Sequence, residues 1–305
     1  MPDNIYQKQA ELLLRILPYI MREDVFVLKG GTAINFFWRD YLRLSVDIDL
    51  TYLKIQDRDL SLLDISDRLA SIEGRIQRIF PGVHTTQKQD TVNRLIYGLI
   101  VNHKETIVKI EANTVIRGAV YPPSKKKLCA KAEELFELTL SANTLSFEDL
   151  YGGKICAALD RQHPRDLFDI KILLDNEGLT DKIVKAFIFY LISHNRPMIE
   201  VLNPGLQNIE QVYDNEFKGM TSNEINLETL LNVRSTLIQK IKTLLTDKQK
   251  AFVLSFKNMK PEWELSAIDG LERYPSVRWK LINLERMDRR KHQMAYDKLK
   301  EYLLE

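Results

Sequence analysis

Two aspartates spaced two residues apart, Asp47 and Asp49, are the first candidates for chemistry in this sequence. They lie in the run 46–51, where apolar and polar residues alternate as they do in a half-buried β-strand. In such a strand both carboxylates point to the same face, roughly 6.5 to 7 Å apart. Paired carboxylates suit Mg²⁺, which is often shared with substrate phosphates. The alternative is a solvent-facing strand edge, because acid-x-acid triplets also arise by chance.

A phosphate cradle is predicted where a short apolar run ends in Lys29, Gly30, Gly31 and Thr32. Two glycines let the backbone approach phosphate oxygens, and the first N–H groups of a helix attract anions. Thr32 is expected to cap the short helix that follows and to add a hydroxyl donor, and Ser45 is a second hydroxyl candidate. The spacing differs from that of a P-loop, and a tight strand-to-helix connection is the alternative interpretation.

Lys109 and Glu111 share one face of a second alternating run, at 107–114. If this strand is a neighbour of the strand that carries Asp47 and Asp49, Glu111 completes a trio of carboxylates. An ordinary solvent-facing strand is the alternative.

The densest cluster of charge follows Lys154 and extends from residue 160 to residue 170. A helix that begins at Pro164 places Asp166 and Asp169 on its apolar stripe. Acidic side chains are rarely buried unless they are paired, and Lys154, Arg161 and Arg165 are near enough in sequence to pair with them. Two interpretations remain: a buried ion-pair lock between two helices, or a wall that binds phosphate and positions a base. His163 is expected to be a turn or N-cap residue rather than a catalytic imidazole.

The elements that would position these residues divide the chain into two parts. The first part is mixed, with helices expected at 7–21, 32–38 and 59–80 and strands at 25–28, 46–51, 94–101 and 106–114. After residue 123 the strand signals mostly stop, and helices are expected at 147–159, 165–175, 181–193, 226–246 and 279–304. We therefore expect a domain over 1–145 and a helical domain over 146–305, with Ser146 as a candidate N-cap.

Length and composition exclude several classes of protein. A chain of 305 residues is expected to form about two domains. With 44 basic and 42 acidic residues, the net charge of +2 is too small to steer nucleic acid on its own. Cys129 and Cys156 lack the spacing of a zinc site or a disulfide framework. The sequence has no apolar run long enough for a membrane span or a signal peptide, so we expect no membrane association and a cytoplasmic protein.

The C-terminal segment is rich in basic residues, Lys280 among them. Such a helix could contact RNA phosphates, and a solvated face is the commoner alternative.

Taken in order, the motifs resemble those of the AbiEii/AbiGii toxin family. The motifs are Lys29-Gly30-Gly31-Thr32, Ser45-Val46-Asp47-Ile48-Asp49-Leu50, Lys109-Ile110-Glu111 and Asp160-Arg161-x-x-x-Arg165-Asp166-x-x-Asp169-Ile170. This resemblance, over about residues 25–175, implies an α+β fold: a DNA polymerase β-like nucleotidyltransferase core with a mixed sheet, followed by an all-helical domain. That second domain would contribute Lys154 and the 160–169 motif to the cleft.

The resemblance also implies roles for individual residues. Asp47 and Asp49 would hold Mg²⁺, Gly30 and Gly31 would cradle phosphates, and Glu111 would be the third acid, either as a ligand or as the proton acceptor. Lys154 and Arg165 would hold the triphosphate, and Asp166 matches a position important for activity. The nucleotide-binding set expected on this basis is Lys29, Gly30, Gly31, Thr32, Ser45, Lys109, Lys154 and Arg165. Thr32 departs from the wider family pattern, which has Gly-Ser at this point.

The activity implied is transfer of a nucleotide from an NTP to the 3′ end of an RNA. In related toxins the acceptor is tRNA, and the modification blocks translation in a toxin–antitoxin or phage-defence system, which makes a cognate antitoxin a further expected partner. Two alternatives stay open: transfer of a nucleotide or phosphate to a protein hydroxyl, and a nucleotide-binding module without turnover.

Overall fold

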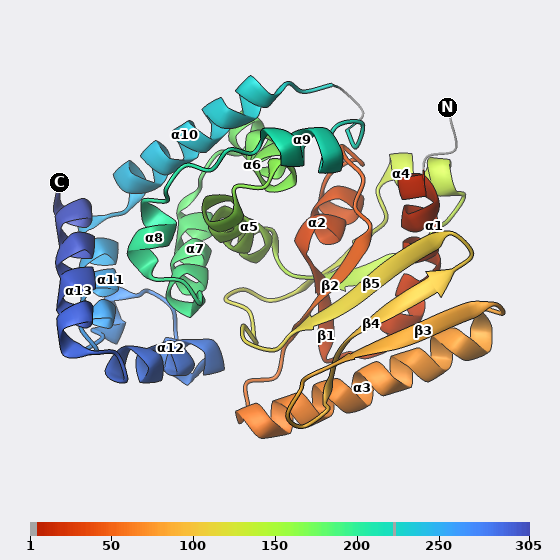
Figure 1. The fold of residues 1–305 in the computed structure, drawn as a ribbon, viewed down its shortest axis with the longest axis horizontal. Helices are drawn as coiled ribbons and strands as arrows, with labels where there is room; N and C mark the ends of the chain where they lie inside the picture. The colour runs from red at the N-terminus through yellow and green to blue at the C-terminus, as the bar shows by residue number, and fades with distance from the viewer. Residues whose placement is uncertain (1–4, 222–223) are drawn as a thin grey trace. The chain divides into compact units, whose positions relative to one another are not determined.

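A computed structural model describes residues 5–221 and 224–305, which form two compact units (Figure 1). The first unit comprises residues 5–146 together with 220–221, and the second comprises 147–219 and 224–305. The chain passes between units after Ser146, one residue from the expected boundary. Met220 and Thr221, expected in the second domain, instead belong to the first unit.

A seven-stranded mixed sheet forms the centre of the first unit, in the order β3-β4-β5-β2-β1-β7-β6. The strands are β1 (Phe26–Lys29), β2 (Asp47–Tyr52), β3 (Val83–Gln89), β4 (Ile96–His103), β5 (Thr106–Asn113), β6 (Ser124–Lys127) and β7 (Ser141–Thr144). β2 is antiparallel to β1 and parallel to β5. The condition on which Glu111 joins Asp47 and Asp49, that β2 and β5 are neighbours, is therefore met, whereas β3, β6 and β7 were not expected from the sequence.

Helices α1 (Ile5–Ile20) and α3 (Arg58–Ile79) pack on the sheet and on each other (Figure 1). The stripe of α1 that includes Leu13, Ile16 and Ile20 is buried, and burial of each such side chain contributes roughly 1.5–3 kcal/mol. Helix α4 (Ala130–Phe136) and the short helix α2 (Gly30–Ala33), which runs on into a π-helical turn (Ile34–Trp38), complete the unit.

The strand that carries the two aspartates is preceded by a segment that pairs with a distant part of the chain. The backbone N–H of Leu44 donates to the carbonyl oxygen of Met220 at 2.9 Å, and Arg43 forms a β-bridge with Thr221. Residues separated by more than 170 positions thus complete the entry into β2.

Among the described residues of the second unit, the regular elements are all helices. Its helices are α5 (Phe147–Arg161), α6 (Pro164–Asn176), α7 (Asp181–Ser193), α8 (Met198–Leu202), α9 (Glu210–Glu216), α10 (Leu227–Leu244), α11 (Asp247–Lys257), α12 (Pro275–Glu285) and α13 (Arg289–Leu304), with 3₁₀ turns at Trp263–Leu265 and Leu271–Arg273. Helix α5 packs closely on α7 because Gly152 has no side chain. A Cβ atom there would lie 2.8 Å from the Cβ and carbonyl carbon of Ala186.

The expected helix over 279–304 is wrong, because the chain forms two helices there. Helix α12 ends at Glu285, and Asp288 caps α13 by accepting a hydrogen bond from the N–H of Lys291 at 3.0 Å. An N-cap aspartate of this kind begins a new helix instead of continuing the old one.

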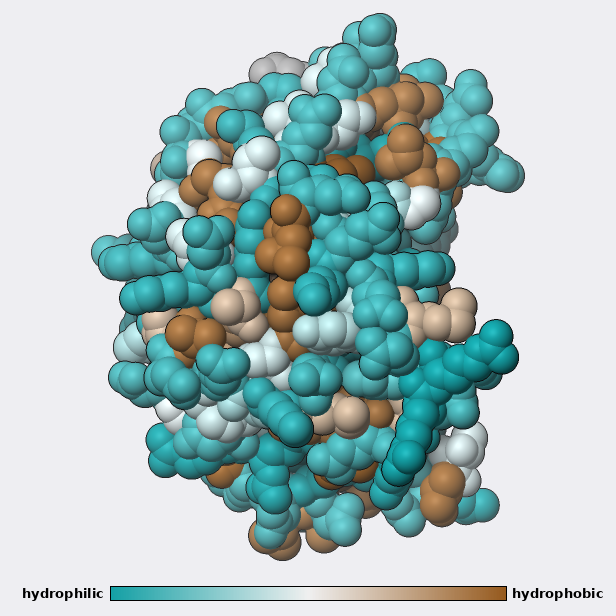
Figure 2. Space-filling model, turned by 90° about the vertical axis from the view of Figure 1, so that its left-hand side faces the viewer, coloured by the Kyte–Doolittle hydropathy of each residue, from teal (hydrophilic) through white to brown (hydrophobic). Residues whose placement is uncertain are grey.

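The surface of the second unit around α13 is largely hydrophilic, with hydrophobic side chains in small separate patches (Figure 2). Among the described residues, no helix is both long and apolar enough to cross a membrane.

Candidate active site

The strand register of the first unit places charged residues from four strands in one row. Lys29 on β1 pairs with Asp49 on β2, and Asp49 pairs with Glu111 on β5. The row continues through Gly98 on β4 to Lys88 on β3. Residues opposite each other in adjacent strands present their side chains to the same face of the sheet. Asp49 therefore has a cationic neighbour on one side and an acidic neighbour on the other.

Asp47 and Asp49 alternate with fully buried residues, as the sequence predicted. Both aspartates are half-buried, whereas Ile48 and Leu50 have no exposed surface. Asp47 is opposite Lys109 in the parallel register with β5. Lys109 therefore lies beside one aspartate and Glu111 beside the other.

The backbone of Gly30 lies directly against the carboxylate of Asp49. Gly30 has a φ of +72°, and a Cβ atom at this position would overlap Asp49 Oδ2. Glycine is needed here both for the left-handed backbone and for the close approach. The first turn of α2 can therefore contact Asp49 only because residue 30 has no side chain.

Gly31 makes a similar close approach to a buried arginine. A Cβ atom on Gly31 would lie 2.5 Å from Arg43 Nη2 and 3.0 Å from Ser45 Oγ. Arg43 is only 3% exposed, and its Nη1 donates to the carbonyl oxygen of Leu44 at 2.8 Å. Arg43 was not expected from the sequence, because nothing in the residues around it distinguishes it from a surface arginine.

Thr32 joins the glycine segment to the start of β2. Its Oγ1 lies 2.6 Å from the carbonyl oxygen of Asp47, to which it donates, and 2.9 Å from Ser45 Oγ. The expectation that Thr32 caps a helix is wrong, because α2 begins at Gly30 with Lys29 at its N-cap and without a side-chain cap. Thr32 and Ser45 are both buried, and the Thr32 hydroxyl group holds the backbone of Asp47.

Glu111 forms an ion pair with Lys88 across Gly98. A Cβ atom on Gly98 would lie 2.8 Å from the carbonyl oxygen of Ile110 and in ordinary contact, at 3.4 Å, with Glu111 Cγ and Lys88 Cδ, so the ion pair passes directly over this glycine. The hydrogen bond from Lys88 to Glu111 raises the pKa of Lys88. Within residues 5–221 and 224–305, no three His, Cys, Asp or Glu side chains are grouped as metal ligands.

The second unit contains a buried ion cluster between α5 and α6. Lys154 Nζ lies 2.7 Å from Asp166 Oδ1 and 3.0 Å from Asp169 Oδ2. Lys154 is 7% exposed, and the two aspartates are 3% and 1% exposed. Arg161 Nη2 adds a contact of 2.8 Å to Asp166 Oδ2. This arrangement is the ion-pair lock between two helices, one of the two alternatives for this motif.

The turn between α5 and α6 is fixed by side-chain hydrogen bonds. His163 is the N-cap of α6, as expected: its Nδ1 accepts from the N–H of Arg165 at 3.1 Å, and its Nε2 lies 3.2 Å from Glu216 Oε2. Burial lowers the pKa of His163. Gln162 has a φ of +52° and accepts a hydrogen bond from Arg234 at 2.8 Å. Neither Gln162 nor Arg234 was expected to matter.

The sequence-predicted residues thus fall into two groups. In the first unit the structure brings together Lys29, Gly30, Gly31, Thr32, Ser45, Asp47, Asp49, Lys109 and Glu111. In the second unit Lys154 and Asp166 are in contact, and Arg165 Nη2 lies 3.8 Å from Glu216 Oε2.

Comparison with known proteins gives one family and a structural neighbour. Residues 11–283 match the family described as nucleotidyl transferase AbiEii toxin, type IV toxin–antitoxin system. Among solved structures, the fold is similar to that of MenT4, a nucleotidyltransferase toxin from Mycobacterium tuberculosis H37Rv, with a TM-score of 0.56 and 13% sequence identity. The similarity covers 97% of this chain and 93% of that one. No curated protein sequence matches the chain. The expected α+β nucleotidyltransferase fold is therefore confirmed.

Proposed function

We propose that this chain, which belongs to the AbiEii family of nucleotidyl transferase toxins, transfers a nucleotide from an NTP to the 3′ end of an RNA, with tRNA as the acceptor. The family consists of toxins of type IV toxin–antitoxin systems, which implies a cognate antitoxin and an NTP substrate. A nucleotide added to the 3′ end of tRNA would prevent aminoacylation and block translation in the cytoplasm, where NTPs and tRNA are found.

The observation that carries this proposal is the contact between the glycine segment and the aspartate strand. Gly30 lies against Asp49, and Thr32 is hydrogen-bonded to the backbone of Asp47. A segment able to approach phosphate oxygens is thereby attached to two carboxylates on one face of a strand. This combination suits a substrate that brings a polyphosphate and a divalent cation together.

Asp47 and Asp49 are the residues that would hold Mg²⁺. Their oxygen donors fit this cation, and both side chains are half-buried on the same face of β2. When bound, the metal would neutralise charge on the phosphoryl oxygens and lower the proton affinity of the attacking hydroxyl. Lys29, opposite Asp49 in the register, would add positive charge near the phosphates.

In the proposed reaction the 3′-hydroxyl oxygen attacks the α-phosphorus in line. The new P–O bond forms as the bond to pyrophosphate breaks, and the hydroxyl proton passes to a carboxylate. Glu111 is our candidate for this acceptor, because it is the neighbour of Asp49 in the sheet. Lys88 holds the Glu111 side chain in place across Gly98.

The helical unit would contribute residues that hold the triphosphate, as the family resemblance implies. Arg165 and Arg161 have partly or largely exposed side chains, and a guanidinium suits phosphate oxygens. Lys154 is already paired with Asp166 and Asp169, so its main contribution is to fix the helix that carries Arg165.

Label transfer tests this proposal directly. The purified protein is incubated with α-³²P- and γ-³²P-labelled forms of each of the four NTPs, alone and with total tRNA. We expect the α label to move to tRNA for at least one NTP and the γ label to leave as pyrophosphate.

Other outcomes of the same assay support the alternatives. Label on the protein itself would indicate transfer to a protein hydroxyl, with the α or γ position distinguishing nucleotidyl from phosphoryl transfer. NTP binding by calorimetry without pyrophosphate release would indicate a silent binding module, and either result would overturn transfer to RNA.

A further inference from the structure

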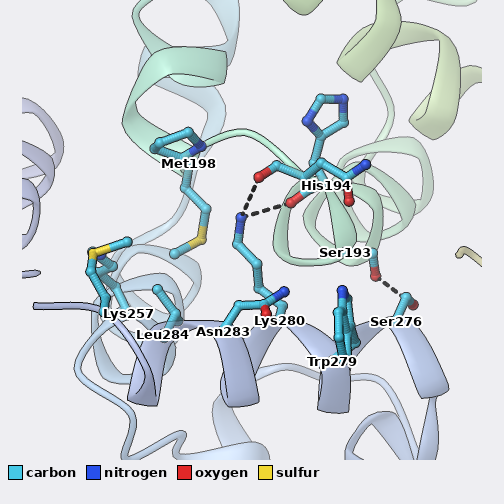
Figure 3. A pocket seen from close by; sticks show the side chains of 12 residues that line it. Ser193, His194, Met198, Lys257, Ser276, Trp279, Lys280, Asn283 and Leu284 are labelled. Atoms are coloured by element: carbon cyan, nitrogen blue, oxygen red, sulfur yellow. Dashed lines mark hydrogen bonds between the residues drawn. The ribbon is translucent and has the colours of Figure 1, made fainter.

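The helical unit contains a cavity of about 90 Å³ that the proposed function does not use (Figure 3). It lies between the C-terminal end of α7, the segment that leads to α8, and one side of α12, with Lys257 from the end of α11 in its wall. Its lining includes Ser193, Met198 and Trp279 but no acidic side chain among the described residues.

Two lysines line this cavity, and both are buried. Lys257 is 5% exposed and Lys280 is 8% exposed. The ammonium group of Lys280 donates to the carbonyl oxygens of His194 and Arg196 at 2.7 Å each, as Figure 3 shows in part, and lies 3.5 Å from that of Asn195. Lys280 therefore holds three successive carbonyl groups, the third of them only weakly.

Lys257 has no comparable partner. Its backbone carbonyl oxygen accepts from His292, but its ammonium group forms no hydrogen bond or ion pair with any residue that the structure describes. Burial lowers the pKa of Lys257. Burial and the nearby charge of Lys257, opposed in part by the charge of Glu200, lower the pKa of Lys280 to about 8, so Lys280 is still mostly protonated at pH 7. Two ammonium groups in the wall of one cavity, with no acidic side chain in its lining, make the cavity favourable for an anion.

Clamping of the 194–196 carbonyl groups explains Lys280 but not Lys257. A second ammonium group in the wall of the same cavity repels that of Lys280 and contributes no hydrogen bond to the carbonyl groups of 194–196. An anion in the cavity would compensate both charges at once.

We infer that this cavity binds a phosphate group, with Lys257 as its principal partner. The volume of about 90 Å³ accommodates a tetrahedral oxyanion. Trp279 is 43% exposed at the same site, so the base of a nucleotide could stack on it while the phosphate occupies the cavity. The phosphate can thus be inorganic or the phosphate of a nucleotide.

Calorimetry with inorganic phosphate tests the inference. Phosphate is titrated into the full-length protein and into the Lys257→Met and Lys260→Met variants at constant ionic strength. Lys260 is an exposed lysine three residues away and serves as the matched control. We expect binding about tenfold weaker in Lys257→Met than in Lys260→Met, because one charge-assisted hydrogen bond is lost. Equal binding by the two variants would overturn the inference.

Lysine acetylation of the wild-type protein provides a test that requires no variant to fold. Acetylation is mapped by mass spectrometry with and without phosphate. We expect phosphate to slow the acetylation of the nearly buried Lys257 below its already low rate while leaving the rate at Lys260 unchanged, and an unchanged rate at Lys257 would overturn the inference. This site-resolved readout also separates the cavity from any phosphate bound at the proposed active site.

Titration with adenosine 5′-monophosphate identifies the source of the phosphate. Binding tighter than that of inorganic phosphate, and lost in Trp279→Leu, would assign the site to a nucleotide. Equal or weaker binding, still dependent on Lys257, would assign it to inorganic phosphate. Binding of neither probe would overturn the inference.

Discussion

The backbone of Gly30 packs against the carboxylate of Asp49, so that a side chain at position 30 would overlap an aspartate oxygen. This contact connects the first turn after β1 with the adjacent antiparallel strand. It makes the position of Asp49 depend on a residue that has no functional group of its own.

Replacing Gly30 with alanine tests this dependence. Ala at a φ of +72° costs roughly 1–2 kcal/mol from backbone strain, and the overlap with Asp49 adds to that cost. Gly82→Ala is the matched control, because Gly82 has a φ of +81° and open space around it. We expect urea denaturation to show a larger loss for Gly30→Ala and label transfer to fall at least about tenfold. Equal stability and activity in the two variants would contradict the role of the contact.

Asp49→Asn tests the metal site. This change keeps the shape of the side chain but removes a charged oxygen ligand, so we expect little change in melting temperature and a loss of transfer of about 10²–10³-fold or more. Asp59→Asn, at an exposed position in the first turn of α3, should keep full activity. An active Asp49→Asn protein would rule out Asp49 as a metal ligand.

The ion pair between Glu111 and Lys88 predicts different effects on the transfer rate when each residue is replaced. If Glu111 accepts the proton, Glu111→Gln should slow transfer about 10²–10⁴-fold. Lys88→Met should slow it much less, and because the pair is partly exposed its loss should cost at most about 1 kcal/mol of stability. Small and equal effects on the transfer rate in the two variants would assign Glu111 a structural role.

In the buried ion cluster between α5 and α6, loss of Lys154 should reduce the stability far more than loss of Arg161, although both contact Asp166. Lys154→Met leaves two buried carboxylates without their common partner and should cost about 3–5 kcal/mol in urea denaturation. Arg161→Met removes a largely exposed partner and should cost about 0–1 kcal/mol. Similar losses in both variants would show that Lys154 is not the centre of the cluster.

Histidine burial predicts how stability depends on pH. The pKa of His163 is lowered in the folded protein, so the unfolded chain binds more protons as the pH falls below about 6.5. Stability is therefore complete above that pH and is lost as the pH falls toward the lowered pKa. His163→Asn keeps an N-cap side chain and should reduce this loss between pH 7 and 5, while exposed His84→Asn should not. Burial also lowers the pKa of His194, so this residue should account for part of the loss of stability that remains in His163→Asn.

The sequence predicted the elements that have strong periodicity. Strand β2 alternates between buried and half-buried residues, and α1 carries a continuous apolar stripe, so both were recognised. Strand β3 was missed because of its seven residues only Val83 is buried, and its pairing with β4 gives no hydrophobic signal. Strands β6 and β7 are short, and the lysines of β6 resemble a loop.

The site was predictable as far as residue types went, but its contacts were not. The alternation of Asp47 and Asp49 follows from the period of a strand, whereas the pairing of Glu111 depends on β3, which the sequence did not indicate. The approach of Arg43 to Gly31 depends on tertiary packing. The burial of Lys280, in a segment expected to form a basic surface helix, likewise depends on the carbonyl groups of 194–196.

The pairing of Leu44 with Met220 has a consequence for synthesis on the ribosome. The segment beside Gly31 and Ser45 lacks its neighbour until residue 221 has left the exit tunnel, long after Asp47 and Asp49 have emerged. A nascent chain released early would carry Asp47 and Asp49, but the segment that precedes their strand would lack its pairing with residues 220–221. Ribosomes that make this protein are thus translating its last third before all the segments of its first unit have been synthesised.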